Sequence, residues 1–291
     1  MGDELLRQRL EHLALAIGDV WGELAFTMCE IGAAPHEKNE NEFLELLQVF
    51  PGSKVAAFEL DTALCGELNR TAPAGIHYYP VALGRTEEQR ILFETNHPMC
   101  SSLYRPNTEL LTRFNELHVA LPKAAHTVWT VSLDHFCTQH QIGAMDFIKI
   151  DIQGAELDVF KGGVTTLSNV QVIFSEVEFV PLYTGQPLFG DVSAFLTTRG
   201  FMFHKFLGLS GRSMSPLVLN NDPCLPTQHL WANALFIRDV TRLEKLSDEA
   251  LLKTAVLAFV YGSPDVSYAC FRVLDERNGW MLHTNILELF S

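Results

Sequence analysis

Short apolar segments alternate with helical segments along most of this chain, and this alternation limits the folds it can adopt. Strands of a parallel sheet are apolar on both sides because helices cover both faces. Right-handed crossovers between such strands leave only doubly wound arrangements. The sequence therefore predicts an α/β fold, with a mainly parallel sheet between two layers of helices. The segments predicted as strands are 24–31, 54–59, 76–83, 146–151, 171–177, 201–206 and 232–237, with a further short strand at 90–94. A helix that starts with the acidic cap Asp61 is predicted at 61–70.

The last two predicted strands, at 201–206 and 232–237, are joined without an intervening helix. The connection at 207–231 is rich in glycine, serine, proline and asparagine, which are typical of loops. A connection of this kind favours an antiparallel pair, which we place at one edge of the sheet. Pro80, inside the third predicted strand, has no amide hydrogen for strand pairing. It therefore indicates the end of a strand or an edge position.

Both ends of the chain are predicted to be helical. Leucine and isoleucine recur at helical spacing in residues 3–18, and the segment after Leu243 is helical with a break at 262–264. The terminal helices are expected to form either a lid over the site or the interface of a homodimer. The predicted divisions are an N-terminal helical extension at 1–23, a Rossmann-like domain at 24–240 and a C-terminal helical appendage at 241–291.

The charge balance and the cysteines limit the partners and the compartment. The chain has 35 acidic and 21 basic side chains, a formal net charge of −14. Because an acidic surface repels phosphate backbones, we expect a small-molecule substrate and no nucleic-acid partner. The six cysteines are scattered without a Cys-x-x-Cys pair, and no apolar run reaches the length of a membrane span. These features predict a cytoplasmic protein that does not enter a membrane.

The ends of the first two strands carry residues suited to binding a cofactor, because ligands of open α/β sheets bind beyond the carboxyl ends of the strands. Gly32 allows a ligand to approach the backbone closely, and the Glu59 carboxylate can accept hydrogen bonds from two ribose hydroxyls. Pyrophosphate is disfavoured because there is one glycine rather than Gly-x-Gly-x-x-Gly and because Glu30 lies beside it. The pattern favours a cofactor with a cationic amino-acid end. The alternative is that Glu30 and Glu59 are ordinary strand-end carboxylates.

The segment Asp146–Gly163 is a predicted buried strand that carries charged residues. Lys149 and Asp151 share one face of the strand, and each buried charge needs a partner. The next strand offers Glu176 and Glu178 on one face, so we expect an ion pair between Lys149 and Glu176. Asp151, nearer the end of its strand, is expected to face the ligand. The alternative for Lys149 and Glu176 is a structural network without chemistry.

One part of this segment, IKIDIQGAELDVFKGG at 148–163, resembles the characteristic segment of the FkbM family of S-adenosylmethionine-dependent methyltransferases. Further segments resemble the family in the expected order, and together the resemblance covers about residues 24–240. These segments are VAAFELD at 55–61, VALG at 81–84, SSLYRPN at 101–107, TVSLDHFC at 130–137 and EVEFVPLYTGQPLF at 176–189.

The resemblance implies a Rossmann-like seven-stranded sheet, mostly parallel with an antiparallel edge strand. It also implies S-adenosylmethionine as the cofactor and transfer of its methyl group, most often to a hydroxyl oxygen. The residues it assigns to the cofactor are Glu30, Gly32 and Ala33 for the methionine part, Glu59 and Leu60 for the ribose, Ala82 for the adenine, Ser102, and Asp151 at the methyl-transfer end.

Two positions depart from the family pattern. The first loop of the family commonly has a second glycine, where this chain has His36, and Pro35 removes a backbone donor. Gln153 stands where an acidic residue is frequent. The missing glycine and Pro35 are expected to alter the contacts to the cofactor's carboxylate more than the binding of the cofactor as a whole.

A hydroxyl nucleophile needs a base or a metal ion. The expected catalytic residues are Asp151, Glu178 and His204, of which His204 would act as the base; His97 and His126 are weaker candidates. A Mg²⁺ or Ca²⁺ site at Asp151, Glu176 and Glu178 is conceivable but not favoured. The main expectation is O-methylation of a small molecule, either a natural product or a sugar. The alternatives are C- or N-methylation, or a non-catalytic cofactor-binding protein.

Overall fold

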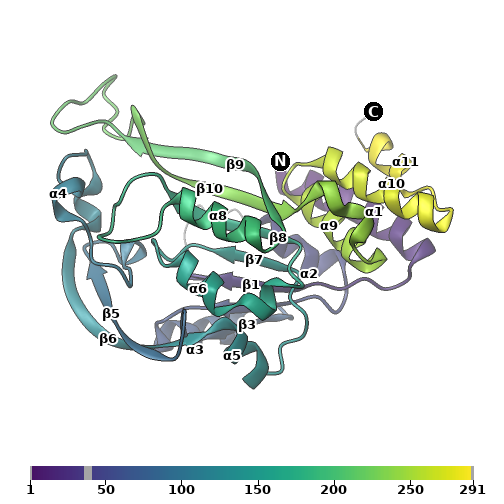
Figure 1. Cartoon of the computed structure of the whole chain (residues 1–291), viewed down its shortest axis with the longest axis horizontal. Helices are drawn as coiled ribbons and strands as arrows, with labels where there is room; N and C mark the ends of the chain where they lie inside the picture. Colours follow the sequence, from purple (N-terminus) through teal and green to yellow (C-terminus); the bar gives the residue numbers. More distant parts are fainter. Residues whose placement is uncertain (1, 36–40, 290–291) are drawn as a thin grey trace.

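A seven-stranded sheet forms the centre of the protein in a computed structural model, which describes residues 2–35 and 41–289. Its strand order is β3-β2-β1-β7-β8-β10-β9, and β10 is the strand that runs against its neighbours (Figure 1). The predicted α/β fold with a mostly parallel seven-stranded sheet is confirmed. The strands are β1 Thr27–Ile31, β2 Lys54–Phe58, β3 Ile76–Tyr79, β7 Phe147–Ile150, β8 Val172–Glu178, β9 Phe201–Arg212 and β10 Gln228–Arg238.

The predicted antiparallel pair lies at one edge of the sheet, but its antiparallel member is one position in from the edge, whereas the resemblance implied an antiparallel edge strand. β10 pairs with β8 on one side and with β9 on the other, so β9 is the edge strand and runs parallel to β8. The burial of the two strands explains this order. Ala234, Leu235 and Phe236 of β10 are fully buried, whereas Met202 and Leu209 of β9 are exposed. The more apolar strand of the pair therefore takes the interior position.

Helices cover both faces of the sheet, and two separate clusters of buried side chains mark the two faces. Met28 and Val55 belong to one cluster, and their neighbours Cys29 and Ala56 belong to the other, as the alternation of a strand requires. The first face is covered by α1 Gly2–Val20, α2 Glu45–Val49, α9 Asp248–Val260, α10 Pro264–Asn278 and α11 Leu282–Glu288. The second is covered by α5 Leu133–Gln139, α6 Glu156–Gly162, α7 Val164–Leu167 and α8 Phe189–Thr198.

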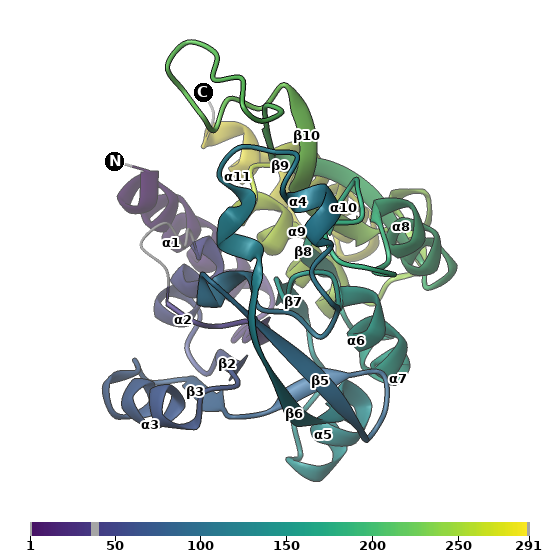
Figure 2. The same cartoon turned by 90° about the vertical axis from the view of Figure 1, so that its left-hand side faces the viewer.

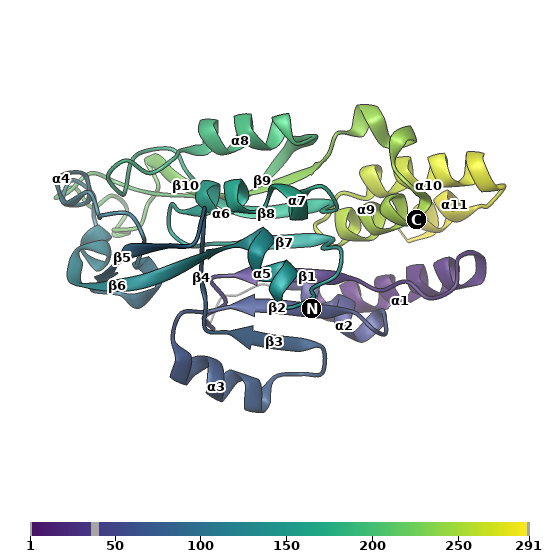
Figure 3. The same cartoon turned by 60° about the horizontal axis from the view of Figure 1, so that its bottom comes forward.

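The terminal helices are part of the core of the sheet. Every residue of α9 from Leu251 to Val260 is buried, and α1, α10 and α11 contribute to the same cluster. Lys253 of α9 forms a buried ion pair with Asp146 at the amino end of β7, with 3.0 Å between Nζ and Oδ2. The terminal helices lie toward the amino ends of the parallel strands (Figures 1 and 3). The expectation that they form a lid is therefore wrong, and the homodimer interface remains a prediction.

A second, three-stranded sheet of order β4-β6-β5 lies over the carboxyl ends of the main strands (Figure 2). The sequence indicated only short pieces of it, because Ile91 and Trp129 on its outer face are exposed and hide the alternation. The predicted strand at 76–83 divides at Pro80, and its two halves join different sheets. The strands are β4 Ala82–Gly84, β5 Glu88–Thr95 and β6 Pro122–Ser132.

The remaining elements are short or peripheral. α3 Thr62–Thr71 follows β2 and is capped by Asp61, as its acidic start predicted. Among the helices that the structure describes, none is both long and apolar enough to cross a bilayer. The other short elements are η1 Glu42–Leu44, η2 Pro98–Cys100, α4 Thr108–Leu111, η3 Leu117–Ala120 and η4 Val240–Lys245.

Candidate functional site

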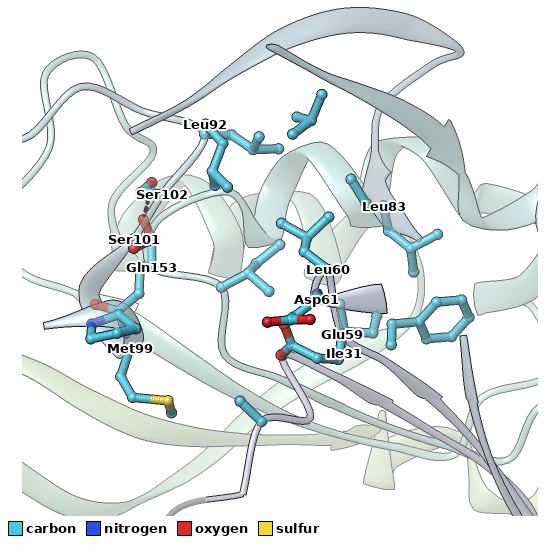
Figure 4. A pocket seen from close by; sticks show the side chains of 18 of the residues that line it. Ile31, Glu59, Leu60, Asp61, Leu83, Leu92, Met99, Ser101, Ser102 and Gln153 are labelled. Carbon is cyan, nitrogen blue, oxygen red and sulfur yellow. Dashed lines mark hydrogen bonds between the residues drawn. The ribbon is translucent and has the colours of Figure 1, made fainter. Parts of the chain in front are cut away.

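A cavity of about 510 Å³ lies between the carboxyl ends of β1, β2 and β7 and the three-stranded sheet above them. We call the part of the cavity wall that β5 and β6 supply the roof. The floor is formed by strand-end residues, among them Ile31, Gly32, Phe58, Glu59 and Asp151. Figure 4 shows Glu59 and Asp61 on one side of the cavity, with Met99, Ser101 and Ser102 across from them.

Gly32 is required at its position by the backbone around it. Its φ is +84°, and a Cβ there would lie 2.0 Å from the carbonyl oxygen of Asp151. The amides of Gly32 and Ala33 both donate to the carbonyl of Phe58, at 3.1 and 2.9 Å. The turn after β1 is thus packed between the ends of β2 and β7. Gly32 lines the cavity, whereas Ala33 is buried beside it and does not.

The turn after β2 aims a carboxylate at the cavity. Glu59 Oε1 accepts a hydrogen bond from the amide of Asp61 at 3.0 Å, and Asp61 in turn caps α3. Glu59, Leu60 and Asp61 all line the cavity, and so does Ala82. Sequence reasoning found Glu59, Leu60 and Ala82, but it read Asp61 only as a helix cap.

Gln153 connects the groups at the β7 end of the cavity. Its Nε2 donates to Asp151 Oδ1 at 2.8 Å and to Glu176 Oε2 at 2.6 Å, and its Oε1 accepts from the hydroxyl of Tyr183. Ser102 Oγ donates to the Gln153 carbonyl at 2.6 Å, which ties this turn to the loop below the roof (Figure 4). An ionised carboxylate in place of Gln153 would have no hydrogens to donate to these two carboxylates.

Carboxylates gather behind this end of the cavity, and burial raises their pKa values. Burial, followed by the nearby Asp151, raises the pKa of Glu176 well above its usual value. Burial and the nearby Glu156 do the same for Glu178, and burial raises the pKa of Glu156 to about 7. Gln153 Nε2 donates to both Asp151 and Glu176, so these two carboxylates are joined through the amide. Within residues 2–35 and 41–289, no three His, Cys, Asp or Glu side chains are arranged to hold a metal ion.

The predicted ion pair between Lys149 and Glu176 is wrong. Lys149 Nζ lies 2.7 Å from Glu30 Oε1, and both side chains are buried. The register explains this choice, because Lys149 stands directly opposite Glu30 on β1 but opposite Phe174 on β8. Glu30 also accepts from Asn41 Nδ2 at 3.1 Å and does not line the cavity. Its expected contact with the methionine part remains a prediction.

Comparison with known proteins identifies the family. The model of the methyltransferase FkbM domain matches residues 30–203, more than half of the chain. The chain belongs to the FkbM methyltransferase family. A curated relative, 2-O-methyltransferase NoeI of Sinorhizobium fredii (strain NBRC 101917 / NGR234), is 40% identical over 60 residues. That match covers 21% of this chain and 25% of the relative, so the chain matches about a quarter of the relative's length.

Two solved structures share a weak overall likeness with this FkbM chain. One is the 23S rRNA methyltransferase ErmE, with a TM-score of 0.34 and 12% identity over 98% of this chain and 96% of that one. The other is LepI in complex with SAM, with a TM-score of 0.29 and 11% identity over 78% of this chain and 46% of that one. The family assignment rests on the domain match.

Two of the expected catalytic residues of this FkbM protein lie outside the cavity. Because β9 extends to Arg212, His204 falls near its start, next to Phe203, which is level with the amino end of β8. Its Nε2 lies 2.7 Å from Ser263 Oγ after α9, and burial lowers its pKa. The expectation that His204 faces the substrate is therefore wrong. Glu178 is only 2% exposed and does not line the cavity, so direct contact with a substrate is not supported either.

Sequence reasoning assigned no site residue to the roof. Leu92, Glu94 and Val128 line the cavity, and His126, which ranked low among the candidates, lines it as well. His97 does not line it, and its Nδ1 accepts from the amide of Met99. The signal for the roof is the alternation of β5 and β6, and the exposed Ile91 and Trp129 obscure it in the sequence. The second-glycine position, His36, lies outside the described residues.

Proposed function

We propose that this protein is an S-adenosylmethionine-dependent methyltransferase that binds its cofactor in the cavity beneath β5 and β6. The observation that carries the proposal is the pair of Glu59 and Gly32 on the cavity floor, at the carboxyl ends of adjacent strands. A carboxylate in this place accepts hydrogen bonds from both hydroxyls of a ribose. Membership of the FkbM family supports the same activity.

The cavity suits the different parts of this cofactor. Glu59 and Leu60 are proposed to hold the ribose, and Ala82 to lie against the adenine. Asp151 offers a carboxylate toward the cationic end, while Gly32 lets that end approach the backbone. The volume of about 510 Å³ lies within the range of ~300–1,000 Å³ that is typical of small-molecule sites. When bound, the cofactor would supply a methyl group on a sulfonium, which is already a good leaving group.

The proposed reaction is O-methylation of a hydroxyl on a small molecule, either a natural product or a sugar. The partial match to a 2-O-methyltransferase supports an oxygen acceptor over carbon or nitrogen. The net charge of −14 supports a small molecule over a phosphate-rich nucleic acid. We further propose that the protein is cytoplasmic, because its cysteines are scattered without a Cys-x-x-Cys pair. We also propose that it forms a homodimer through its terminal helices.

Isothermal titration with S-adenosylhomocysteine tests the proposed cofactor site. Glu59→Ala is expected to raise the Kd about 100-fold or more, because two hydrogen bonds to a charged group are lost. Glu67→Ala is the matched control, since Glu67 is an exposed carboxylate of α3 that does not line the cavity. No binding by the wild type at millimolar ligand, or equal binding by both variants, would contradict the proposal.

A further inference from the structure

The roof of the cavity changes from apolar to polar along its length. Leu92 and Glu94 of β5, with Val128 and His126 of β6, point to the cavity at every second position. Val128 lies two residues from Thr130, which pairs with Ala82 at the proposed adenine end. Leu92 and His126 stand directly opposite each other one step further along the two strands, and Glu94 lies beyond them. The end of the roof away from Ala82 is therefore its polar end, formed by Glu94 and His126.

A histidine and a carboxylate form a pair at this polar end. His126 Nε2 lies 2.9 Å from Glu94 Oε2, and Lys123 Nζ lies 2.6 Å from Glu94 Oε1. Among the histidines that the structure describes, His126 is the one that lines the cavity. The ion pair with Lys123, followed by the bond to His126, lowers the pKa of Glu94, so its carboxylate is ionised near neutral pH. An ionised partner at Nε2 favours the tautomer that leaves Nδ1 free to accept a proton.

We propose that the acceptor binds beneath this polar end of the roof and that His126, oriented by Glu94, takes the proton from the acceptor hydroxyl. This inference rests on the proposed methyltransferase function and names the acceptor side of the same site. The Glu94 carboxylate and the His126 imidazole suit a polyhydroxylated acceptor such as a sugar, because each can hydrogen-bond to hydroxyl groups.

The proposed step transfers a methyl group from sulfur to the acceptor oxygen and a proton from that oxygen to His126. The bond from the acceptor oxygen to the methyl carbon forms as the bond from that carbon to sulfur breaks, and the electron pair of the broken bond stays on sulfur. The hydroxyl proton passes to Nδ1 of His126. Because 55% of the His126 side chain is exposed, the proton can then leave to water.

Asp151 is less suited to this role, although it also lines the cavity. Its Oδ1 already accepts a hydrogen bond from Gln153, and the same amide holds Glu176. These contacts fix Asp151 at the β7 end, where a carboxylate can offset the charge of a cationic cofactor. We therefore assign Asp151 to the cofactor side of the cavity and the Glu94–His126 pair to the acceptor side.

The test compares cofactor binding with methyl transfer in His126→Gln, which keeps a donor toward Glu94 but has no basic nitrogen. The probes are S-adenosylhomocysteine for titration, and S-adenosylmethionine with a panel of hexoses and methyl hexosides for turnover, with methyl ethers detected by mass spectrometry. We expect an unchanged Kd for S-adenosylhomocysteine and a fall in kcat of about 100-fold or more. His283→Gln is the matched control, because His283 Nδ1 also pairs with a carboxylate, Asp275 at 2.6 Å, but outside the cavity.

Glu94 is a positioning residue in this proposal, and its variants separate orientation from folding. Glu94→Gln is expected to lower kcat with little change in KM, and Glu94→Asp to recover part of the loss. Full turnover by His126→Gln would overturn the proposal, as would equal losses in His126→Gln and His283→Gln. Wild-type protein that binds S-adenosylhomocysteine but methylates no sugar would overturn the acceptor assignment alone. Wild-type protein that binds no S-adenosylhomocysteine would instead refute the proposed function.

Discussion

Single residues at the strand ends decide how closely the backbone can pack around the cavity. Gly32 has a positive φ and touches the end of β7, so no side chain fits there. Gln153 also has a positive φ, of 58°, and its side chain serves two carboxylates at once. At the scale of single residues, the chemistry of the site depends on the backbone conformation of these residues as much as on their charge.

Gly32→Ala tests this packing. The added Cβ would meet the Asp151 carbonyl at 2.0 Å and would force a left-handed conformation on alanine. We expect a loss of at least about 2 kcal/mol in the free energy of unfolding, measured in urea. Gly66→Ala in α3 is the control, because a Cβ there meets nothing within 4 Å. That variant should be neutral or stabilising by up to about 1 kcal/mol, and an equal loss in both variants would contradict the argument.

At the scale of helices and strands, the register between neighbouring strands determines which charged side chains form ion pairs. The sequence indicated that Lys149 needs an acidic partner, and it offered Glu176 and Glu178 on the next strand. The partner is Glu30 because β7 pairs with β1 in a register that sets the two residues opposite each other. Periodicity within one strand shows which face a side chain takes, but it carries no information on the neighbouring strand's register.

Lys149→Met tests the ion pair that joins β1 to β7. Removing one partner leaves the buried Glu30 carboxylate uncompensated, so we expect a loss of about 3–5 kcal/mol in the free energy of unfolding. The double variant with Glu30→Gln should recover much of that loss, since neither charge then remains. Arg272→Met is the control, because it removes an exposed pair with Glu276 and should cost less than about 1 kcal/mol. Additive losses in the double variant would show that the two residues are not coupled.

The whole molecule carries a large negative charge and keeps several carboxylates buried at one end of its cavity. Glu156 accepts hydrogen bonds from the amides of Ile152 and Gly154, and burial raises its pKa to about 7. The folded state therefore holds a proton that the unfolded chain releases above about pH 4.5. Stability from this group is complete below pH 4.5 and is lost as the pH rises toward 7.

Glu156→Gln should remove that pH dependence, because the amide oxygen keeps both hydrogen bonds but cannot ionise. We expect the variant to match the wild type near pH 4.5 and to exceed it at pH 8 by on the order of 3 kcal/mol. Urea unfolding across this pH range measures the difference. A variant that is less stable than the wild type at pH 8 would show that the Glu156 charge is needed by the fold.

The sequence by itself determined the sheet, the family and most of the cavity floor. Gly32, Glu59, Leu60 and Asp151 line the cavity, as expected of residues at strand ends. Ala82 and Ser102, which the family resemblance implied, line it as well. These predictions succeeded because strand ends are defined by local apolar runs, and parallel strands bring their carboxyl ends to one edge. Their roles in binding the cofactor remain predictions.

Only the tertiary structure decided the roof, the partner of Lys149 and the histidine that faces the cavity. The histidine that lines the cavity is His126 and not His204. His204 lies near the start of the long strand β9, at the opposite end of the sheet, whereas the pairing of β5 with β6 places His126 over the site. The terminal helices likewise joined the core rather than a lid. Each of these outcomes depends on pairing between segments far apart in the chain, and such pairing follows from packing free energy that no single segment encodes.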